Sequence, residues 1–336
     1  MSSGHGSTSS LGELSTELVR LLADGRFHSG EALGRRLGVS RAAVWKRLRE
    51  LEALGLSPER VRGKGYRLPG GLELLERERI AAAAGPALDR YRLVLLDSTG
   101  STNTAALEAF QSGDGMPVVT LAEHQHAGRG RRGRGWHSPY GCNLYLSLAR
   151  AFESASRLEG LSLAVGLAVA ETLESHGLGD RVGLKWPNDI YCGGRKLGGI
   201  LVELAGDLDA DCTAVIGIGI NGRMAAEAES RIDQPWTDLA RESDTPVARN
   251  RLAGQLIDRL SEVLDTFLVQ GFAGLHARWE RHDCCAGRRV QLQSGEHRVE
   301  GVARGVDERG ALLLESEGRV APWHGGEVSL RLDGTR

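Results

Sequence analysis

The chain has 336 residues, of which 41% are hydrophobic and 26% are charged, and its formal net charge is −2. This length allows two or three domains, and the composition excludes a disordered or collagen-like chain. No stretch approaches the ~20 consecutive apolar residues of a membrane span, no basic and apolar leader opens the chain, and the five cysteines show no paired spacing. We therefore expect a cytoplasmic protein with reduced thiols and no structural metal site.

Charge is unevenly distributed along the chain. Residues 1–70 hold twelve Lys and Arg against seven Asp and Glu, a net of +5, whereas the rest of the chain carries −7. A basic N-terminal part on an acidic body is typical of a protein with a DNA-contacting module. Residues 1–10, mostly Ser and Gly, are expected to form a flexible start.

Three short helices followed by a basic hairpin are predicted in residues 11–70. Ser29 and Ser40 begin the second and third helices, and Gly38 ends the second, which predicts a helix-turn-helix. Residues 61–68 resemble the wing of winged-helix domains. The alternative is a three-helix protein-interaction bundle with a solvated charged face. The side chains predicted to contact DNA are Ser29, Ser40, Arg41, Trp45, Lys46, Arg49 and Lys64.

Residues 71–284 are predicted to form one mixed α/β domain, entered by a helical connector from Leu72 to Ala84. Two long helices are expected around Leu158–Leu173 and Leu252–Leu268. The predicted strands are Tyr91–Leu96, Pro117–Leu121, Asn143–Leu148, Lys196–Leu204 and Ala214–Ile220.

Residues 285–336 contain five short alternating runs separated by tight turns, which predicts a small SH3-like β-barrel. These runs are Val290–Leu292, Val299–Ala303, Ala311–Glu315, Val320–Pro322 and Val328–Leu332. The fold class is thus an α+β multidomain protein with a winged helix-turn-helix first, a mixed α/β domain second and a small barrel last.

The most informative stretch is residues 128–134, in which three glycines alternate with four arginines. Glycines let a backbone approach a ligand closely, and arginine guanidinium groups bind phosphate or carboxylate oxygens through two hydrogen bonds at once. Such a loop is expected to order only when an anionic ligand neutralises it. The alternative is an RNA-binding or merely solvated Arg/Gly tract.

Two lysine-bearing strings follow in the same domain, Lys185–Asp189 and Arg195–Glu203. A lysine at a strand edge is usually a solvated residue, but Lys196 is followed by Gly198 and Gly199, which let a ligand approach the strand. A third string, Gly217–Asn221, ends a buried strand with a polar amide where a cleft would lie.

Taken together, the chain is similar to the bifunctional biotin–protein ligase and biotin operon repressor family. The resemblance covers about residues 14 to 332 and is carried, in one order, by Phe27–Glu31, Ser40–Ala43, Gly63–Tyr66, Ser101–Asn103, Gln125 with Ala127–Arg134, Lys185–Asp189, Arg195–Glu203, Gly217–Asn221 and Pro322–Gly326. The family makes biotinyl-5′-AMP from biotin and ATP, then moves biotin to a lysine of the biotin carboxyl carrier protein of acetyl-CoA carboxylase. The resemblance also implies a repressor that binds operator DNA with biotinyl-5′-AMP as corepressor, as a homodimer when the adenylate is bound.

The resemblance implies roles for individual residues. The expected biotin site is Ser101, Thr102, Asn103, Gln125, Arg129, Gly130, Arg131 and Lys196, and the expected ATP and adenylate site is Arg131, Arg132, Arg134, Trp136, Lys185, Asn188 and Asn221. The expected catalytic residues are Lys196, Arg129, Arg131, Lys185 and Asp189, and Asp189 would orient or deprotonate the incoming lysine unless it is a plain ion pair with Lys185. Mg²⁺ is expected on the ATP phosphates, held by substrate oxygens and water.

Three departures from the family pattern stand out. A second Ser-Thr pair at Ser98 and Thr99 leaves the register of the Ser-Thr-Asn motif open between residues 97 and 103. His126 lies where a second Gln is common, and Trp45 is bulky for a helix that reads DNA. Two alternative functions stay open, a lipoate-type protein ligase and a ligand-responsive DNA-binding repressor without catalysis.

Overall fold

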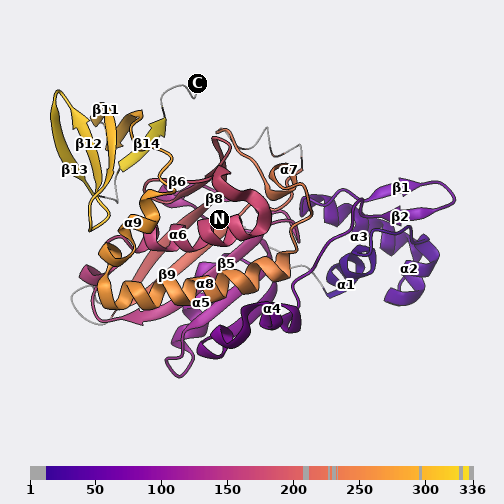
Figure 1. Ribbon diagram of the computed structural model, residues 1–336. Coiled ribbons are helices and arrows are strands. Elements are labelled where there is room, and N and C mark those ends of the chain that lie inside the picture. Colours follow the sequence, from indigo (N-terminus) through magenta and orange to yellow (C-terminus); the bar gives the residue numbers. More distant parts are fainter. Residues whose placement is uncertain are drawn as a thin grey trace, which may run out of the picture.

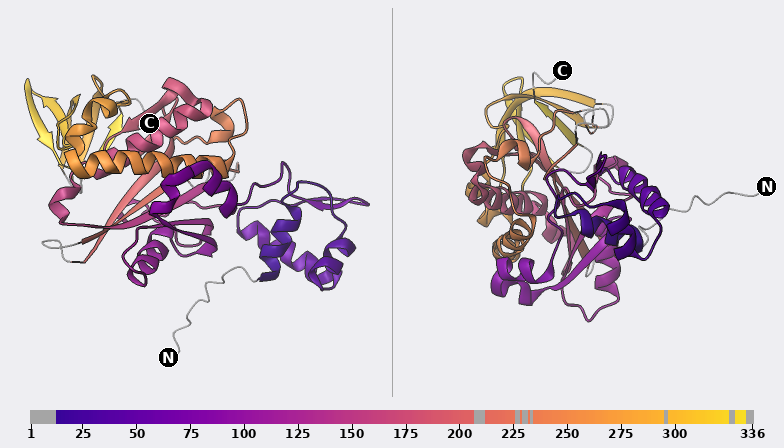
Figure 2. Two further views of the ribbon diagram at one scale, coloured as in Figure 1. Left: turned by 60° about the horizontal axis from the view of Figure 1, so that its bottom comes forward. Right: turned by 90° about the vertical axis from the view of Figure 1, so that its right-hand side faces the viewer.

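The computed structural model describes residues 13–206, 212–225, 228, 232, 234–294, 297–324 and 328–332. It has three parts in the predicted order (Figure 1). The helix-turn-helix domain and the C-terminal sheet lie at opposite ends of the central domain, as the left view of Figure 2 also shows. The predicted flexible start, residues 1–10, lies outside the described residues. Among the helices of the described segments, none is both long enough and apolar enough to cross a membrane.

The N-terminal domain confirms the predicted winged helix-turn-helix. Its elements are α1 (Glu13–Leu22), α2 (Gly30–Leu37), α3 (Arg41–Ala53), β1 (Glu59–Val61) and β2 (Gly65–Arg67). The hydroxyls of Ser29 and Ser40 cap α2 and α3 by accepting from the backbone N–H groups of Ala32 and Ala43, and Gly38 ends α2 with a φ of 67°. The wing is held to the helices because His28 and Tyr66 exchange two backbone hydrogen bonds of 2.8 Å.

The connector after the wing is helical only in its second half, so the predicted helix from Leu72 is wrong for residues 72–76. The helix α4 covers Arg77–Ala84. Before it, the N–H of Leu75 donates to Glu123 Oε1 (2.5 Å) and that of Glu76 donates to Asn250 Oδ1 (2.7 Å). Because distant side chains satisfy these backbone groups, the segment is held extended without helical hydrogen bonds.

The central domain is built on a seven-stranded sheet with the strand order β3-β4-β5-β9-β8-β7-β6, in which only β3 and β4 are parallel. The strands are β3 (Arg92–Thr99), β4 (Val118–Gln125), β5 (Leu144–Phe152), β6 (Val182–Lys185), β7 (Asp189–Cys192), β8 (Arg195–Gly206) and β9 (Cys212–Ile220). The helices are α5 (Thr102–Gln111), α6 (Leu161–Leu173), α7 (Leu239–Glu242), α8 (Arg249–Gln270) and α9 (His276–Glu280). The five predicted strands and two long helices are therefore confirmed, whereas α5 and the β6-β7 hairpin were not predicted.

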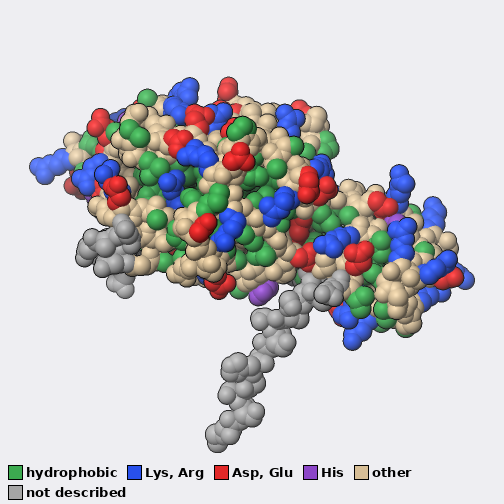
Figure 3. Space-filling model, turned by 90° about the horizontal axis from the view of Figure 1, so that it is seen from below, with side chains coloured by type: hydrophobic (Ala, Val, Ile, Leu, Met, Phe, Trp, Pro, Cys, Tyr) green, Lys and Arg blue, Asp and Glu red, His purple; other side chains and the backbone are tan. Residues whose placement is uncertain are grey.

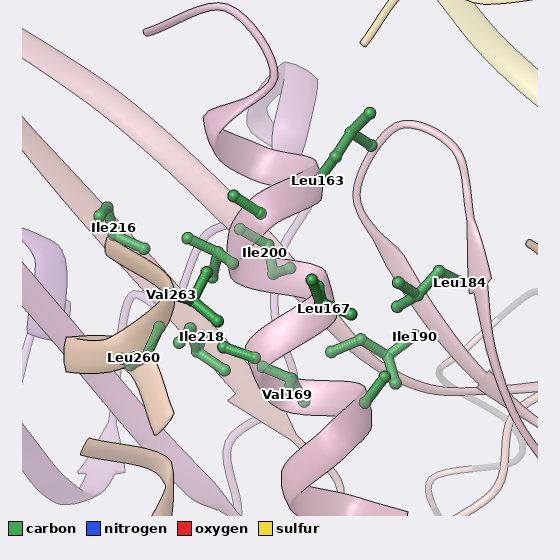
Figure 4. Packing of buried hydrophobic residues seen from close by; sticks show 14 of the residues in the cluster. Leu163, Leu167, Val169, Leu184, Ile190, Ile200, Ile216, Ile218, Leu260 and Val263 are labelled. Carbon is green, nitrogen blue, oxygen red and sulfur yellow. The ribbon is translucent and has the colours of Figure 1, made fainter. Parts of the chain in front are cut away.

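The two faces of the sheet are covered differently (Figure 1). The helix α6 is buried on nearly all sides because it lies between the sheet and α8. Its Leu167 lies on the side of Ile190 and Leu184, and its Val169 lies on the side of Ile218 of β9 and Val263 of α8 (Figure 4). The shorter helix α5 covers part of the other face through a small cluster of Ala106, Leu107 and Phe110 with Ala149 and Val215. The helix α5 therefore leaves part of this second face of the sheet uncovered.

The C-terminal domain is a small antiparallel five-stranded sheet with the order β13-β12-β11-β10-β14, as predicted for an SH3-like barrel. Its strands are β10 (Arg289–Ser294), β11 (His297–Val306), β12 (Leu312–Ser316), β13 (Arg319–Trp323) and β14 (Val328–Leu332). Val306 and Leu312 belong to the main hydrophobic core, and the indole of Trp186 donates to the carbonyl of Gly310 (2.9 Å). The sheet is therefore packed directly on the central domain.

The helix-turn-helix domain is joined to the central domain through Tyr140. Its ring is fully buried in the core of the N-terminal domain, and its N–H donates to the carbonyl of Leu54 (2.9 Å). Its hydroxyl donates to Asp97 Oδ1 (2.6 Å), while Thr16 of α1 donates to Asp97 Oδ2 (2.5 Å). A carboxylate of β3 thus accepts hydrogen bonds from both domains.

Candidate functional site

A row of glycines leaves space on the face of the sheet that carries α5. Gly199 of β8 pairs with Gly219 of β9, and Gly217 lies two residues before Gly219 on the same face. A Cβ atom at Gly217 would lie 2.3 Å from Asn103 Oδ1, and one at Gly219 would lie 2.7 Å from the Trp136 indole. The side chains of two predicted site residues therefore rest directly on backbone, and a residue larger than glycine would displace them.

A buried polar cluster forms where α5 begins. Gln125 Oε1 accepts from the N–H (2.8 Å) and the hydroxyl (3.0 Å) of Thr102. Asn103 Nδ2 donates to Glu203 Oε2 (2.7 Å), and the hydroxyl of Ser147 donates to Asn103 Oδ1 (2.6 Å). Hydroxyl and amide groups are thus concentrated and oriented at one end of the glycine row.

The register of the Ser-Thr-Asn motif follows from the same contacts. Ser101 directly precedes α5 and is buried beside Thr102 and Asn103. Ser98 instead lies on β3, where its hydroxyl is 3.0 Å from Nδ1 of His124. Thr99 is the strand partner of Gln125, but it is Thr102 of residues 101–103 that hydrogen-bonds to the Gln125 side chain.

The Arg/Gly loop forms a short hairpin beside this cluster. The N–H of Gly130 donates to the carbonyl of Arg134 (2.7 Å), and that of Trp136 donates to the carbonyl of Gly128 (2.8 Å). At the tip, Arg132 has a φ of 57°, in the left-handed region that non-glycine residues seldom adopt. The side chains of Arg132 and Arg134 are exposed. The predicted ordering of this loop by an anionic ligand stays a prediction.

Two arginines of the loop reach the body of the domain. Arg129 Nη2 lies 3.4 Å from both carboxylate oxygens of Glu203, and Arg131 Nη1 donates to Asn188 Oδ1 (3.1 Å). Burial lowers the pKa of the Arg131 guanidinium, and the nearby charge of Arg132 lowers it further. A local excess of positive charge of this kind favours an anionic ligand.

Lys196 and Asp189 form a half-buried ion pair at the other end of the glycine row. Their side chains are 15% and 17% exposed, Lys196 Nζ lies 2.6 Å from Asp189 Oδ1, and it lies 5.9 Å from the centroid of the Trp136 ring. Lys185 Nζ instead donates to the hydroxyl of Tyr191 (3.0 Å). The ion pair considered between Asp189 and Lys185 is therefore wrong, since the partner of Asp189 is Lys196.

One predicted site residue points elsewhere. Asn221 is buried, and its Nδ2 donates to the carbonyl of Thr237 (2.9 Å), which fixes the segment before α7. Its expected contact with the adenylate stays a prediction. Two residues of the site were missed, Ser147 and Glu203. The signal for Glu203 was present, since it alternates with Gly199 and Leu201 on one face of a strand and is the charged member of that row.

The seven residues predicted to contact DNA are all exposed on the N-terminal domain. Lys and Arg side chains crowd the surface of this end of the molecule (Figure 3). Trp45 is 48% exposed, and the Arg49 guanidinium lies 5.1 Å from its ring centroid. Lys64 of the wing lies 5.8 Å from the ring of Phe27. The two basic side chains thus lie near aromatic rings on the surface that was predicted to contact DNA.

Three family models match consecutive parts of the chain. They are an HTH domain over residues 14–67, the biotin/lipoate A/B protein ligase family over residues 95–221, and the biotin protein ligase C-terminal domain over residues 286–331. Their order is that of the three structural parts. The predicted combination of a DNA-binding domain with a ligase domain is therefore confirmed.

Relatives match over almost the whole length. The bifunctional ligase/repressor BirA of Salmonella typhimurium is 44% identical over 94% of this chain and 96% of its own, and BirA of Bacillus subtilis is 30% identical over 94% and 98%. The biotin protein ligase of Aquifex aeolicus, solved in complex with biotin and ATP, is 30% identical, covers 72% of this chain and 99% of its own, and superimposes with a TM-score of 0.60. The chain belongs to the family of bifunctional biotin–protein ligases and biotin operon repressors.

Proposed function

We propose that the chain joins biotin to ATP to form biotinyl-5′-AMP and transfers the biotin to a lysine of a biotin carboxyl carrier protein. The observation that carries this proposal is the arrangement of cations around the glycine row. Arg129 and Arg131 reach in from the hairpin, Lys196 lies at the opposite end, and a buried polar cluster lies beside them. Such a site can hold a polar head group at one end and phosphates at the other.

In the first step an oxygen of the biotin carboxylate attacks the α-phosphorus of ATP, and pyrophosphate leaves. Both reactants are anions, and charge accumulates on the nonbridging oxygens in the transition state. The guanidinium groups of Arg129 and Arg131 and the ammonium of Lys196 would offset that charge from fixed positions. Mg²⁺ would arrive with ATP, held by phosphate oxygens and water.

In the second step the neutral amine of the carrier lysine attacks the carbonyl of the mixed anhydride, and AMP leaves. In the structure Lys196 forms an ion pair with Asp189. Movement of Lys196 to the phosphate would free the Asp189 carboxylate to accept a hydrogen bond from the amine. An Asp189→Asn variant is expected to slow transfer from preformed biotinyl-5′-AMP. A transfer rate equal to that of the unchanged protein would remove Asp189 from this role.

The chemistry of the pocket favours biotin over lipoate. The matching ligase family includes both specificities, but the ureido ring of biotin needs donors and acceptors, whereas a dithiolane ring needs only apolar walls. The buried groups of Thr102 and Asn103, together with the partly buried Gln125, supply both. We expect biotin, and not lipoate, to be activated when the two acids are offered at equal concentration.

The test of the enzyme activity is a single incubation of the purified protein with ATP, Mg²⁺ and labelled biotin, followed by isolation of the bound nucleotide. Labelled biotinyl-5′-AMP is the expected product, and a Lys196→Gln variant should form far less of it. Arg309→Gln is a matched control, because Arg309 is a cation that pairs with Glu159 away from the site. If no adenylate forms with the unchanged protein, the proposed activity is wrong.

The N-terminal domain supports a second activity of the same chain, repression of biotin operon genes. We expect the domain to bind operator DNA more tightly when biotinyl-5′-AMP is present, as a homodimer that spans two half-sites. Sedimentation with and without the adenylate measures the assembly, and a gel-shift titration with operator DNA measures the affinity. Equal operator affinity in both conditions would contradict the corepressor role.

A further inference from the structure

Glu203 contacts both the polar cluster at the start of α5 and the Arg/Gly hairpin. One of its carboxylate oxygens accepts from Asn103 Nδ2 (2.7 Å), and both lie 3.4 Å from Arg129 Nη2. Asn103 is in turn oriented from its other side by Ser147, which donates to Asn103 Oδ1 (2.6 Å). A single acidic side chain thus connects the polar cluster to the Arg/Gly hairpin.

The two contacts of Glu203 differ in strength. The bond to Asn103 is short, and Asn103 is almost fully buried. The pair with Arg129 is longer, and its side chains are 42% and 39% exposed, so water screens it and a competing anion can reach it. Arg129 is also held by Thr104, whose hydroxyl accepts from Nη2 at 3.2 Å. An incoming carboxylate or phosphate that binds Arg129 at Nη2 therefore competes with Glu203 and need not disturb Asn103.

From this geometry we infer that Glu203 is a positioning residue that holds Asn103 and competes with the anionic head of the substrate acid for Arg129. The inference rests on the proposed function, in which that acid is biotin. Glu203 lowers the affinity for the charged form of the ligand, because the free energy of the Arg129–Glu203 pair is lost when the ligand carboxylate replaces Glu203. A neutral ligand of the same shape does not displace Glu203 and is not subject to this competition.

The test compares biotin with its neutral amide, biotinamide, by calorimetric titration of the full chain. In Glu203→Gln the amide oxygen still accepts from Asn103, but the negative charge that binds Arg129 is absent. The ratio of biotin affinity to biotinamide affinity should rise about two- to fivefold, the range that an exposed ion pair supports. Added salt should reduce this difference, because screening weakens the ion pair in the unchanged protein.

Two further variants sharpen the result. Glu203→Asp keeps the charge but withdraws it by about one carbon–carbon bond, so it should raise the same ratio by less. Glu159→Gln removes one negative charge that pairs with Arg309 rather than with Arg129, and should leave the ratio unchanged. An unchanged or lowered ratio in Glu203→Gln, including equal weakening of both ligands, overturns the inference. Failure of the unchanged protein to bind biotin at all would instead overturn the proposed function.

Discussion

Gly217→Ala should damage the site more than a Gly→Ala substitution at either of the other two glycines of the row, Gly199 and Gly219. The new Cβ would lie 2.3 Å from Asn103 Oδ1, whereas ordinary contacts begin near 3.4 Å, so Asn103 must move by about 1 Å. Asn103 cannot move freely, because Ser147 and Glu203 hold it from both sides. Overpacking together with a strained hydrogen bond to a charged group costs about 2–4 kcal/mol of the free energy of unfolding.

Two neighbouring glycines provide the comparison. At Gly199 the nearest atoms to a Cβ are 3.6 Å away, so Gly199→Ala should change the free energy of unfolding by no more than about 0.5 kcal/mol. At Gly219 the clash is with the partly exposed Trp136 indole, whose Nε1 makes no hydrogen bond that would hold the ring in place. Gly219→Ala should therefore shift the tryptophan fluorescence with a smaller loss of stability than Gly217→Ala.

Urea unfolding followed by fluorescence and by circular dichroism ranks the three variants, and biotin titration of Gly217→Ala reports on the polar cluster. We expect Gly217→Ala to lose both stability and biotin affinity. If Gly217→Ala and Gly199→Ala unfold at the same urea concentration, the close approach of Asn103 to the sheet is wrong, and the reasoning about the glycine row fails with it.

Three other predictions concern the framework around the site. Arg249→Met should lower the free energy of unfolding by about 3–5 kcal/mol, because it leaves the Glu123 carboxylate buried without its partner. The Glu123 side chain is 7% exposed and lies 2.8 Å from the guanidinium. A loss under about 1 kcal/mol in urea unfolding contradicts this. Tyr140→Phe keeps the buried ring but removes a donor to Asp97, and should lower the free energy of unfolding of the N-terminal domain by about 1.5–3 kcal/mol. An unchanged urea midpoint would show that this bond contributes nothing. Burial lowers the pKa of His124 from 6.5 to about 4, so the folded state binds this proton less readily than the unfolded chain, and the stability present above pH 6.5 is lost as the pH falls toward 4. His124→Asn should flatten that loss when unfolding is compared at pH 7 and pH 5, and an equally steep loss would remove His124 as its source.

The parts of the fold that sequence predicted well are those with a strong local pattern. The helix-turn-helix is marked by Ser29, Gly38 and Ser40, each of which performs a local capping role that the structure confirms. The long amphipathic helix α8 and the β-branched strand β9 are equally clear. Local chemistry alone determines where such elements begin and end.

The missed parts depend on contacts between distant residues. The helix α5 has only ten residues, opens with polar side chains, and buries just a few small residues, so its periodicity is weak. The extended segment 72–76 is determined by Asn250 and Glu123, which lie far along the chain. Glu203 likewise meets Asn103 across a separation of 100 residues, so the alternation that marks Glu203 within β8 does not predict which residue it contacts.

The burial of Tyr140 in the N-terminal domain has a practical consequence for anyone who shortens this protein. A fragment that starts at residue 71 would expose an aromatic ring together with Leu72 and Leu74, which pack in the same cluster. Newly solvent-exposed apolar surface of this kind promotes aggregation. A stand-alone catalytic fragment would therefore need polar substitutions at these three positions before its yield or turnover could be compared with that of the whole chain.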